Sequence, residues 1–332
     1  MSLAIGIDLG GTNLRAGALR AEGGALEASH RELIGEDRAA GALVDRIAGV
    51  VERLAGSAAG GGPGANDAPV PVGIGVAAML RDPRGTVARS PHLGWRDVPF
   101  GRLMRERLGP RFAVGVYNDV NAVTWGEAVS GAARGCRDVL AVYVGTGIGG
   151  GVIAGGALLD GATCCAGEIG HVKVRWDDSA APCNCGGRGC VEAYVGGSYL
   201  DRRIRREVAA ERARTQAIRI AGAPDRVNAA HVDQAAAEGD EWALALWREL
   251  APMLAVTLAN ALAVLNSERL VLGGGLLSRT PTLVSMVDSA LRIVAPPPIL
   301  EPLTVAMAEL GDDAGVVGAA RLAAAGTAVA GP

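Results

Sequence analysis

The chain has 332 residues, 49% of them hydrophobic, which is enough for two domains with a large buried core. Its formal net charge of −3 leaves no basic excess, so binding to nucleic acid or to an anionic membrane by charge is excluded. Lys173 is the only lysine, and it lies in neither a P-loop nor a protein-kinase motif, so both of these phosphate-binding devices are excluded.

The first half of the chain predicts alternating strands and helices. Apolar residues and glycines in residues 4–33 predict three strands joined by glycine turns, and helical spacing of apolar residues follows over 37–54. No secretory signal pattern opens the sequence, so we expect a cytoplasmic protein. A linker is expected at 56–71, followed by a strand at 70–78. A further strand is expected at 111–119 and a helix at 121–131.

The second half repeats the first in outline. From residue 138 the chain gives an apolar strand, a Gly-Thr turn, a second strand and a Gly-Gly turn. The uncharged stretch 139–159 has membrane-spanning length, but glycines break it, so no membrane contact is expected. Two similar α/β halves imply a nucleotide held in the cleft between them. Two helices, a strand with a glycine turn, and a closing helix complete the chain, at 199–214, 241–266, 268–277 and 315–326.

Three glycine turns at strand ends can present backbone amides to phosphate, and Asp8 can hold hydrated Mg²⁺. Each turn alone is equally compatible with an ordinary β-hairpin. Residues 145–150 also match a dinucleotide fingerprint, which makes an NAD-dependent oxidoreductase an alternative, but a hairpin pattern follows where that motif requires a helix. The turns comprise Asp8, Gly10, Gly11 and Thr12, then Gly145, Thr146 and Gly147, then Gly273, Gly274 and Gly275.

A histidine and three closely spaced cysteines predict a closed, structural Zn²⁺ site. These residues are His171, Cys183, Cys185 and Cys190. The alternative is a set of free or disulfide-paired cysteines with an unrelated histidine.

Three carboxylates lie in positions suited to sugar chemistry. Glu168 and Glu192 flank the cysteine cluster and are either solvated loop acids or acceptors for vicinal sugar hydroxyls. Asn118 and Asp119 end a strand, so they form either an Asx turn or helix cap, or a site in which Asp119 accepts a hydroxyl proton during phosphoryl transfer.

Together these segments resemble the ROK family of bacterial sugar kinases, and within it the glucokinases. The resemblance rests on IGIDLGGTNLRAG, SPHLGWRDVPF, NDVNAVTWGEA, VGTGIGGGVIAGGALLDG, AGEIGHVKV with CNCGGRGCVEAY, and LVLGGGL. It implies an α/β, actin-like (ribonuclease-H-like) fold with two similar domains around a cleft. The smaller domain would comprise residues 1–120 with the helix at about 312–330, and the larger domain residues 121–311.

The resemblance also implies an ATP- and Mg²⁺-dependent kinase that phosphorylates the 6-hydroxyl of glucose, usually as a homodimer. By position, Asp119 matches the general base, and the turns at residues 8–12 and 145–147 match the phosphate loops. The residues that match the sugar ligands are Asn118, Asp119, Glu168, His171 and Glu192, and those that match the zinc ligands are His171, Cys183, Cys185 and Cys190.

Two segments depart from the family pattern. Residues 76–79 are Val-Ala-Ala-Met where Pro-Gly is common, and His92-Leu93 replaces Asn-Leu. Fructose, mannose or an N-acetylhexosamine therefore remain alternative substrates. A non-catalytic, sugar-responsive regulator is a further alternative, although only two residues precede the first expected strand and no basic helix-turn-helix pattern is present.

Overall fold

The computed structural model describes residues 3–20, 26–58, 68–210 and 214–326. Parts of the expected first-half turns, of the linker at 56–71, of the helix at 199–214 and of the helix at 312–330 lie outside the described residues. The chain divides into two compact units. Unit 1 comprises residues 1–135, 158–166 and 309–332, and unit 2 comprises residues 136–157 and 167–308.

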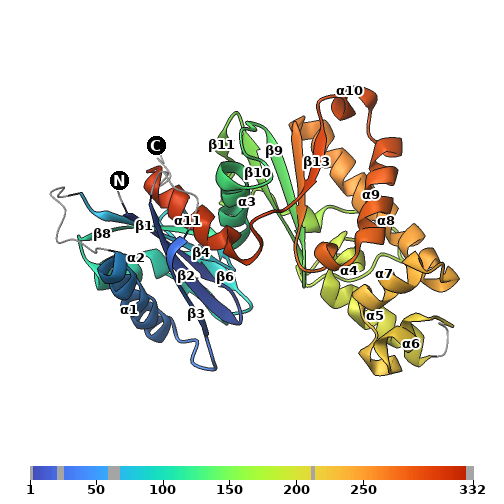
Figure 1. Ribbon diagram of the computed structural model, residues 1–332, viewed down its shortest axis with the longest axis horizontal. Helices are drawn as coiled ribbons and strands as arrows, with labels where there is room; N and C mark the ends of the chain where they lie inside the picture. Colours follow the sequence, from blue (N-terminus) through green and yellow to red (C-terminus); the bar gives the residue numbers. More distant parts are fainter. Residues whose placement is uncertain (1–2, 21–25, 59–67, 211–213, 327–332) are drawn as a thin grey trace. The chain divides into compact units, whose positions relative to one another are not determined.

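A five-stranded sheet of order β3-β2-β1-β4-β8 lies at the centre of unit 1 (Figure 1). β1 (Leu3–Leu9), β2 (Asn13–Arg20) and β3 (Leu26–Leu33) pair antiparallel, which confirms the three strands predicted from the glycine turns. β4 (Val70–Val76) and β8 (Phe112–Asn118) continue the sheet parallel to β1.

Helices cover both faces of this sheet (Figure 1). Because successive strand residues point to opposite faces, Ile5 and Ile7 of β1 pack toward α1 while Gly6 faces α11. A Cβ on Gly6 would lie 1.8 Å from the Val316 carbonyl oxygen, so only glycine lets α11 lie directly on the sheet. The unit 1 helices are α1 (Ala40–Ala58), α2 (Phe100–Leu108), α3 (Asp119–Ser130) and α11 (Ala314–Ala324), beside a small sheet of β5 (Met79–Leu80), β6 (Val87–Ser90) and β7 (Trp95–Val98).

The division between the units falls after residue 135, beyond α3, whereas the sequence placed it at 120. The reason is a contact between segments far apart in the chain. A Cβ on Gly318 of α11 would lie 1.7 Å from the carbonyl oxygen of Ala122, so α11 and α3 are packed backbone to backbone. This contact assigns α3 to unit 1.

Unit 2 has a second five-stranded sheet, of order β11-β10-β9-β12-β13. β9 (Val139–Val144) pairs antiparallel with β10 (Ile148–Ala154) and parallel with β12 (Arg269–Gly273). β12 in turn pairs parallel with β13 (Thr304–Met307), and the short β11 (Ala157–Leu158) completes the sheet. The strand order, and the directions of β9, β10, β12 and β13, reproduce those of unit 1, which confirms the predicted internal repeat.

A long apolar helix, α8 (Glu241–Leu265), forms the core of unit 2. By length and composition alone it could cross a membrane. Its side chains Trp247, Leu250, Leu254 and Leu258 are fully buried against neighbouring elements, so packing accounts for its apolar composition. The other helices of unit 2 are α4 (Glu192–Val195), α5 (Gly197–Ala209), α6 (Ala217–Ala221), α7 (Ala229–Ala237), α9 (Pro281–Val294) and α10 (Pro297–Leu300).

Candidate functional site

The carboxyl end of β8 carries Asn118 and Asp119. Asn118 Oδ1 accepts hydrogen bonds from the backbone N–H groups of Val120 at 2.9 Å and Asn121 at 3.1 Å, and its Nδ2 donates to the Ala78 carbonyl at 3.1 Å. The helix-cap interpretation is therefore confirmed for Asn118. Asp119 is the half-buried first residue of α3, where the N-terminal end of the helix favours a negative charge.

The first glycine turn joins β1 to β2 in unit 1. The Gly10 N–H donates to the Asn13 carbonyl at 3.0 Å and closes the turn. Asp8, at its entrance, accepts a hydrogen bond from Arg15 Nη1 at 3.1 Å. Burial raises the pKa of Asp8, and the hydrogen bond and charge of Arg15 act in the opposite direction. Burial disfavours the ionised form of this carboxylate. A divalent cation bound to it would offset that cost and stabilise the negative charge.

Both segments that depart from the family pattern lie beside this turn. The Ala77 N–H donates to the Leu9 carbonyl at 3.0 Å, and Ser90 Oγ donates to the Ala77 carbonyl at 2.8 Å. A Cβ on Gly11 would lie 2.8 Å from the Cβ of His92, so His92 is in direct contact with the turn. The departures therefore contact the candidate phosphate turn.

The second glycine turn joins β9 to β10 in unit 2 and is fixed to the start of α5. The Gly145 N–H donates to the Gly147 carbonyl at 2.9 Å. The Gly197 and Ser198 N–H groups, at the start of α5, donate to the carbonyls of Gly145 and Thr146, each at 2.9 Å. Because the carbonyls of the turn are bound to α5, the turn has a defined backbone conformation.

Glu192 supports the same turn from the other side. Its Oε2 accepts a hydrogen bond from the Ile148 N–H at 2.9 Å, and a Cβ on Gly147 would lie 2.5 Å from that oxygen. Its Oε1 lies 3.8 Å from Cys183 Sγ. Glu192 is half-buried at the start of α4, so it is not a solvated loop acid. It connects the glycine turn to the cysteine cluster.

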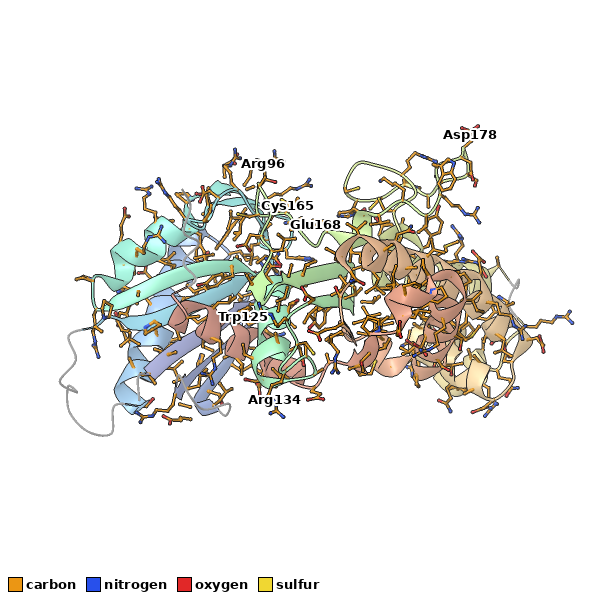
Figure 2. The ribbon with its side chains drawn as sticks, turned by 90° about the horizontal axis from the view of Figure 1, so that it is seen from above. Arg96, Trp125, Arg134, Cys165, Glu168 and Asp178 are labelled. Carbon is orange, nitrogen blue, oxygen red and sulfur yellow. The ribbon has the colours of Figure 1, made fainter. Side chains whose placement is uncertain are left out.

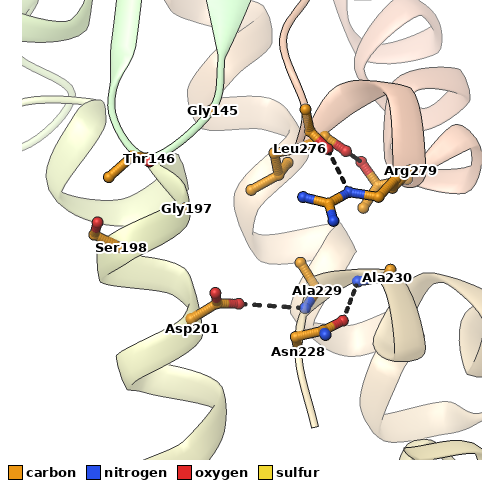
Figure 3. Close-up of a pocket in the computed structure, with 12 residues that line it drawn as sticks. Gly145, Thr146, Gly197, Ser198, Asp201, Asn228, Ala229, Ala230, Leu276 and Arg279 are labelled. Atoms are coloured by element: carbon orange, nitrogen blue, oxygen red, sulfur yellow. Dashed lines mark hydrogen bonds between the residues drawn. The ribbon is translucent and has the colours of Figure 1, made fainter. Parts of the chain in front are cut away.

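The third glycine turn follows β12. Gly274 has φ +89°, and a Cβ there would lie 2.5 Å from the Val144 carbonyl, so this position requires glycine. Gly275, next in the chain, lines a cavity of about 440 Å³ within unit 2 (Figure 3). Gly145 and Thr146 line the same cavity, so the structure brings the second and third turns together.

Polar side chains from several elements also line this cavity (Figure 3). Asn228 caps α7 and accepts a hydrogen bond from the Ala230 N–H at 3.0 Å, while Arg279 Nε donates to the Gly275 carbonyl at 2.7 Å. Ser198 and Asp201, both on α5, also line it. These four residues were not predicted from the sequence, because they come from separate segments that share no motif.

The four residues predicted to bind zinc form one cluster in unit 2. Their ligand atoms all lie within 4.8 Å of one another. His171 Nδ1 lies 3.8 Å from Cys183 Sγ, and Cys185 Sγ lies 3.7 Å from Cys190 Sγ. A tetrahedral site with Zn–S bonds of about 2.3 Å has S···S edges of about 3.8 Å. The donor set and its spacing therefore fit a zinc ion.

The cysteines are free thiols in this structure, which argues against the disulfide alternative. Burial raises the pKa of Cys183 to about 12 in the absence of a metal, whereas the Gly187 backbone N–H lowers the pKa of Cys185. A cation is what would stabilise the thiolate form of all three cysteines together.

Glu168 lies beside the cluster, with Oε2 at 3.6 Å from His171 Nε2. The two ring nitrogens of His171 therefore face different partners, with Nδ1 toward the cysteines and Nε2 toward Glu168. Glu168 is exposed at the surface, and in Figure 2 it lies away from Asp178, which is at the projecting end of the cysteine-rich loop. A ligand can reach the Glu168 carboxylate.

Two sheets of the same strand order, each with a glycine turn between its first two antiparallel strands, define the actin-like ATPase fold. A carboxylate at the end of β8, in the same sheet as the glycine turn between β1 and β2, suits a small-molecule phosphotransferase. The chain belongs to the ROK family, which matches residues 4–325.

Its relatives agree with this assignment. The glucokinase of Streptomyces coelicolor is 34% identical over 97% of this chain and 98% of its own length. The glucokinase of Thermotoga maritima is 32% identical, with 96% of each chain covered. A ROK family glucokinase from Streptomyces griseus, solved in complex with glucose and AMPPNP, has a TM-score of 0.75 and 31% identity, and covers 98% of this chain and 100% of that one. The resemblance found in the sequence is confirmed.

Proposed function

We propose that this protein is an ATP-dependent kinase that phosphorylates the 6-hydroxyl of glucose. The observation that carries the proposal is the position of Asp119, a carboxylate at the carboxyl end of β8 and the amino end of α3. Glucokinase relatives along nearly the whole chain, and a similar fold solved with glucose and AMPPNP, support this reaction.

In this proposal Asp119 is the general base. Its carboxylate accepts the proton of the sugar 6-hydroxyl as that oxygen forms a bond to the γ-phosphorus of ATP. The bond between the γ-phosphorus and the β,γ-bridging oxygen breaks, and ADP leaves with the electron pair. Asn118 is a sugar ligand, and its bonds to α3 and to Ala78 fix its orientation.

The glycine turns hold the nucleotide. We assign the phosphates to residues 8–12 and 145–147. Because the N–H groups of Gly10 and Gly145 close their own turns, other backbone N–H groups of these turns would be the donors. Asp8 would hold Mg²⁺, which neutralises phosphate charge when bound. The adenosine part would occupy the 440 Å³ cavity, where the backbone of Gly275 leaves room and Asp201, Asn228 and Arg279 offer polar contacts.

The zinc site has a structural role in this proposal. Four ligands close the coordination shell, so the ion braces the loop and leaves chemistry to Asp119. Glu168, His171 and Glu192 are the proposed ligands for the remaining sugar hydroxyls, and the brace fixes their positions. A homodimer and a cytoplasmic location stay predictions.

A coupled assay of ADP release tests the reaction and the substrate together. With ATP and Mg²⁺, glucose should give the highest kcat/KM in a panel that also contains fructose, mannose and N-acetylated hexosamines. A preference for another hexose would contradict glucose as the substrate and leave the kinase reaction in place. Absence of ADP formation with every sugar would contradict the kinase and favour a sugar-responsive regulator.

A further inference from the structure

Lys173 is the only lysine among 32 basic Lys and Arg residues, and its side chain lies at the cysteine cluster. Its Nζ donates a hydrogen bond to Cys190 Sγ at 2.8 Å. The backbones of the two residues pair as an isolated antiparallel bridge, which fixes the lysine opposite its sulfur partner. Lys173 and Cys190 are therefore held together by a backbone bridge as well as by the side-chain hydrogen bond.

A second sulfur lies close to the same ammonium group. A Cβ on Gly187 would lie 3.0 Å from Lys173 Nζ and 3.5 Å from Cys185 Sγ, so both atoms border the space that glycine leaves empty. An ammonium group is compact, whereas a guanidinium is a wide planar fork. The loop thus leaves space for a compact cation beside two of the three sulfurs.

We propose that Lys173 is an outer-shell partner of the zinc site, which holds the Cys190 thiolate and balances the charge of the ligand shell. The inference rests on the zinc site of the proposed function. Three thiolates, a neutral imidazole and Zn²⁺ carry a net charge of about −1, and one ammonium group neutralises it. A hydrogen bond from a cation to a thiolate also orients that ligand toward the metal.

Lys173 contacts the zinc ligand Cys190 and takes no part in the proton transfer assigned to Asp119. It is therefore a positioning residue. Its removal should change how firmly zinc is held before it changes the chemistry of phosphoryl transfer. The measurable consequence is the rate and affinity of zinc exchange, which can be followed on the purified protein without sugar or ATP.

The test compares Lys173→Met, which keeps the aliphatic stem and removes the charge, with Lys173→Arg, which keeps the charge. Arg175→Met is the matched control, because Arg175 lies two residues further along and donates to Ser179 Oγ at 3.2 Å. Zinc content is measured by elemental analysis, and zinc transfer to a chelating dye by absorbance. Circular dichroism verifies that each variant is folded.

For Lys173→Met we expect zinc affinity to fall by about 10-fold to 100-fold, the range typical of losing an outer-shell partner. Arg175→Met should behave as the wild type, and Lys173→Arg should fall between the two. Zinc release from folded Lys173→Met at the wild-type rate would overturn the inference. Wild-type protein purified without zinc would overturn the zinc site and this inference with it, while ADP release would still report separately on the kinase.

Discussion

Glu127 and Leu310 lie 183 positions apart, and the Glu127 carboxylate accepts a hydrogen bond from the Leu310 N–H at 2.9 Å. The same carboxylate accepts hydrogen bonds from the N–H groups of Ala132 at 2.8 Å and Glu309 at 3.0 Å, and its side chain is fully buried. The chain first leaves unit 1 after residue 135, returns for residues 158–166, and re-enters it for the last time at 309. One buried carboxylate therefore fixes the unit 1 ends of the first and the last of these connections.

Glu127→Gln should destabilise the protein, because the amide group would direct its own N–H donors at backbone N–H donors. We expect the free energy of unfolding to fall by about 3 kcal/mol, as for the loss of several hydrogen bonds to a buried charged group. Urea denaturation measures the effect. The matched control is Glu309→Gln, whose side chain is exposed, and an equal loss in both variants would contradict this role of Glu127.

The hydrogen-bond partners of Glu127 could not be predicted from the sequence. The residue lies in a helix whose apolar spacing was predicted, but its partners are backbone groups brought to it by α11 and its preceding turn. Nothing in the local pattern distinguishes such an acid from a solvated one. Non-local packing of α11 on α3 also places α3 in unit 1. The boundary between the units therefore lies after residue 135, whereas the sequence predicted it at 120.

The zinc site is the opposite case, because its ligands fall within one short stretch of chain. Spacing alone indicated His171 and the three cysteines, and the structure brings their ligand atoms together. The glycine turns were also predicted from the sequence, since glycines that follow an apolar strand indicate a tight turn. The polar wall of the cavity was not, because Asp201, Asn228 and Arg279 meet only in the folded chain.

Cys185→Ser tests the structural role of zinc. Purified wild-type protein should contain about one zinc per chain, and the variant should lose most of it because one of four ligands is weakened. The melting temperature should fall by roughly 5 °C or more, since bound metal contributes to folding stability. Cys136→Ser, a change of the same kind outside the cluster, should keep both its zinc and its melting temperature. Equal zinc content in the two variants would contradict the assignment of Cys185.

The Arg203–Glu249 ion pair predicts a pH dependence of stability. Arg203 Nη1 and Nη2 contact the two oxygens of Glu249 at 2.7 and 2.6 Å, and this hydrogen bonding lowers the pKa of Glu249 below its usual 4.5 while burial opposes it. A carboxyl whose pKa is lower in the folded state contributes stability above its unfolded pKa, and that contribution is lost as the pH falls through the folded pKa.

Glu249→Gln should therefore lower the free energy of unfolding by about 1 kcal/mol at pH 7, because the pair is partly solvent-screened. The difference from wild type should shrink as the pH falls below 4.5. Urea denaturation over a series of pH values measures it. Glu241→Gln serves as the control, since its contact with Arg248 is 3.7 Å long and highly exposed. A difference that stays constant down to about pH 3.5 would show that the carboxylate charge is not responsible.

In the proposed reaction Asp119 accepts the proton of the glucose hydroxyl, and the Asp119→Asn variant tests this role. The asparagine keeps the size and the hydrogen-bonding shape of the side chain but cannot take up the proton. Asp45→Asn, an exposed acid of α1 paired with Arg107, is the matched control. Glucose binding is followed by calorimetry, and phosphorylation by formation of glucose 6-phosphate from ATP.

The measurement is the kcat for this transfer in the wild type and the two variants. We predict that Asp119→Asn lowers kcat by about 100-fold or more while it still binds glucose, and that Asp45→Asn retains the wild-type rate. An Asp119→Asn enzyme that phosphorylates glucose at the wild-type kcat would show that Asp119 is not the general base.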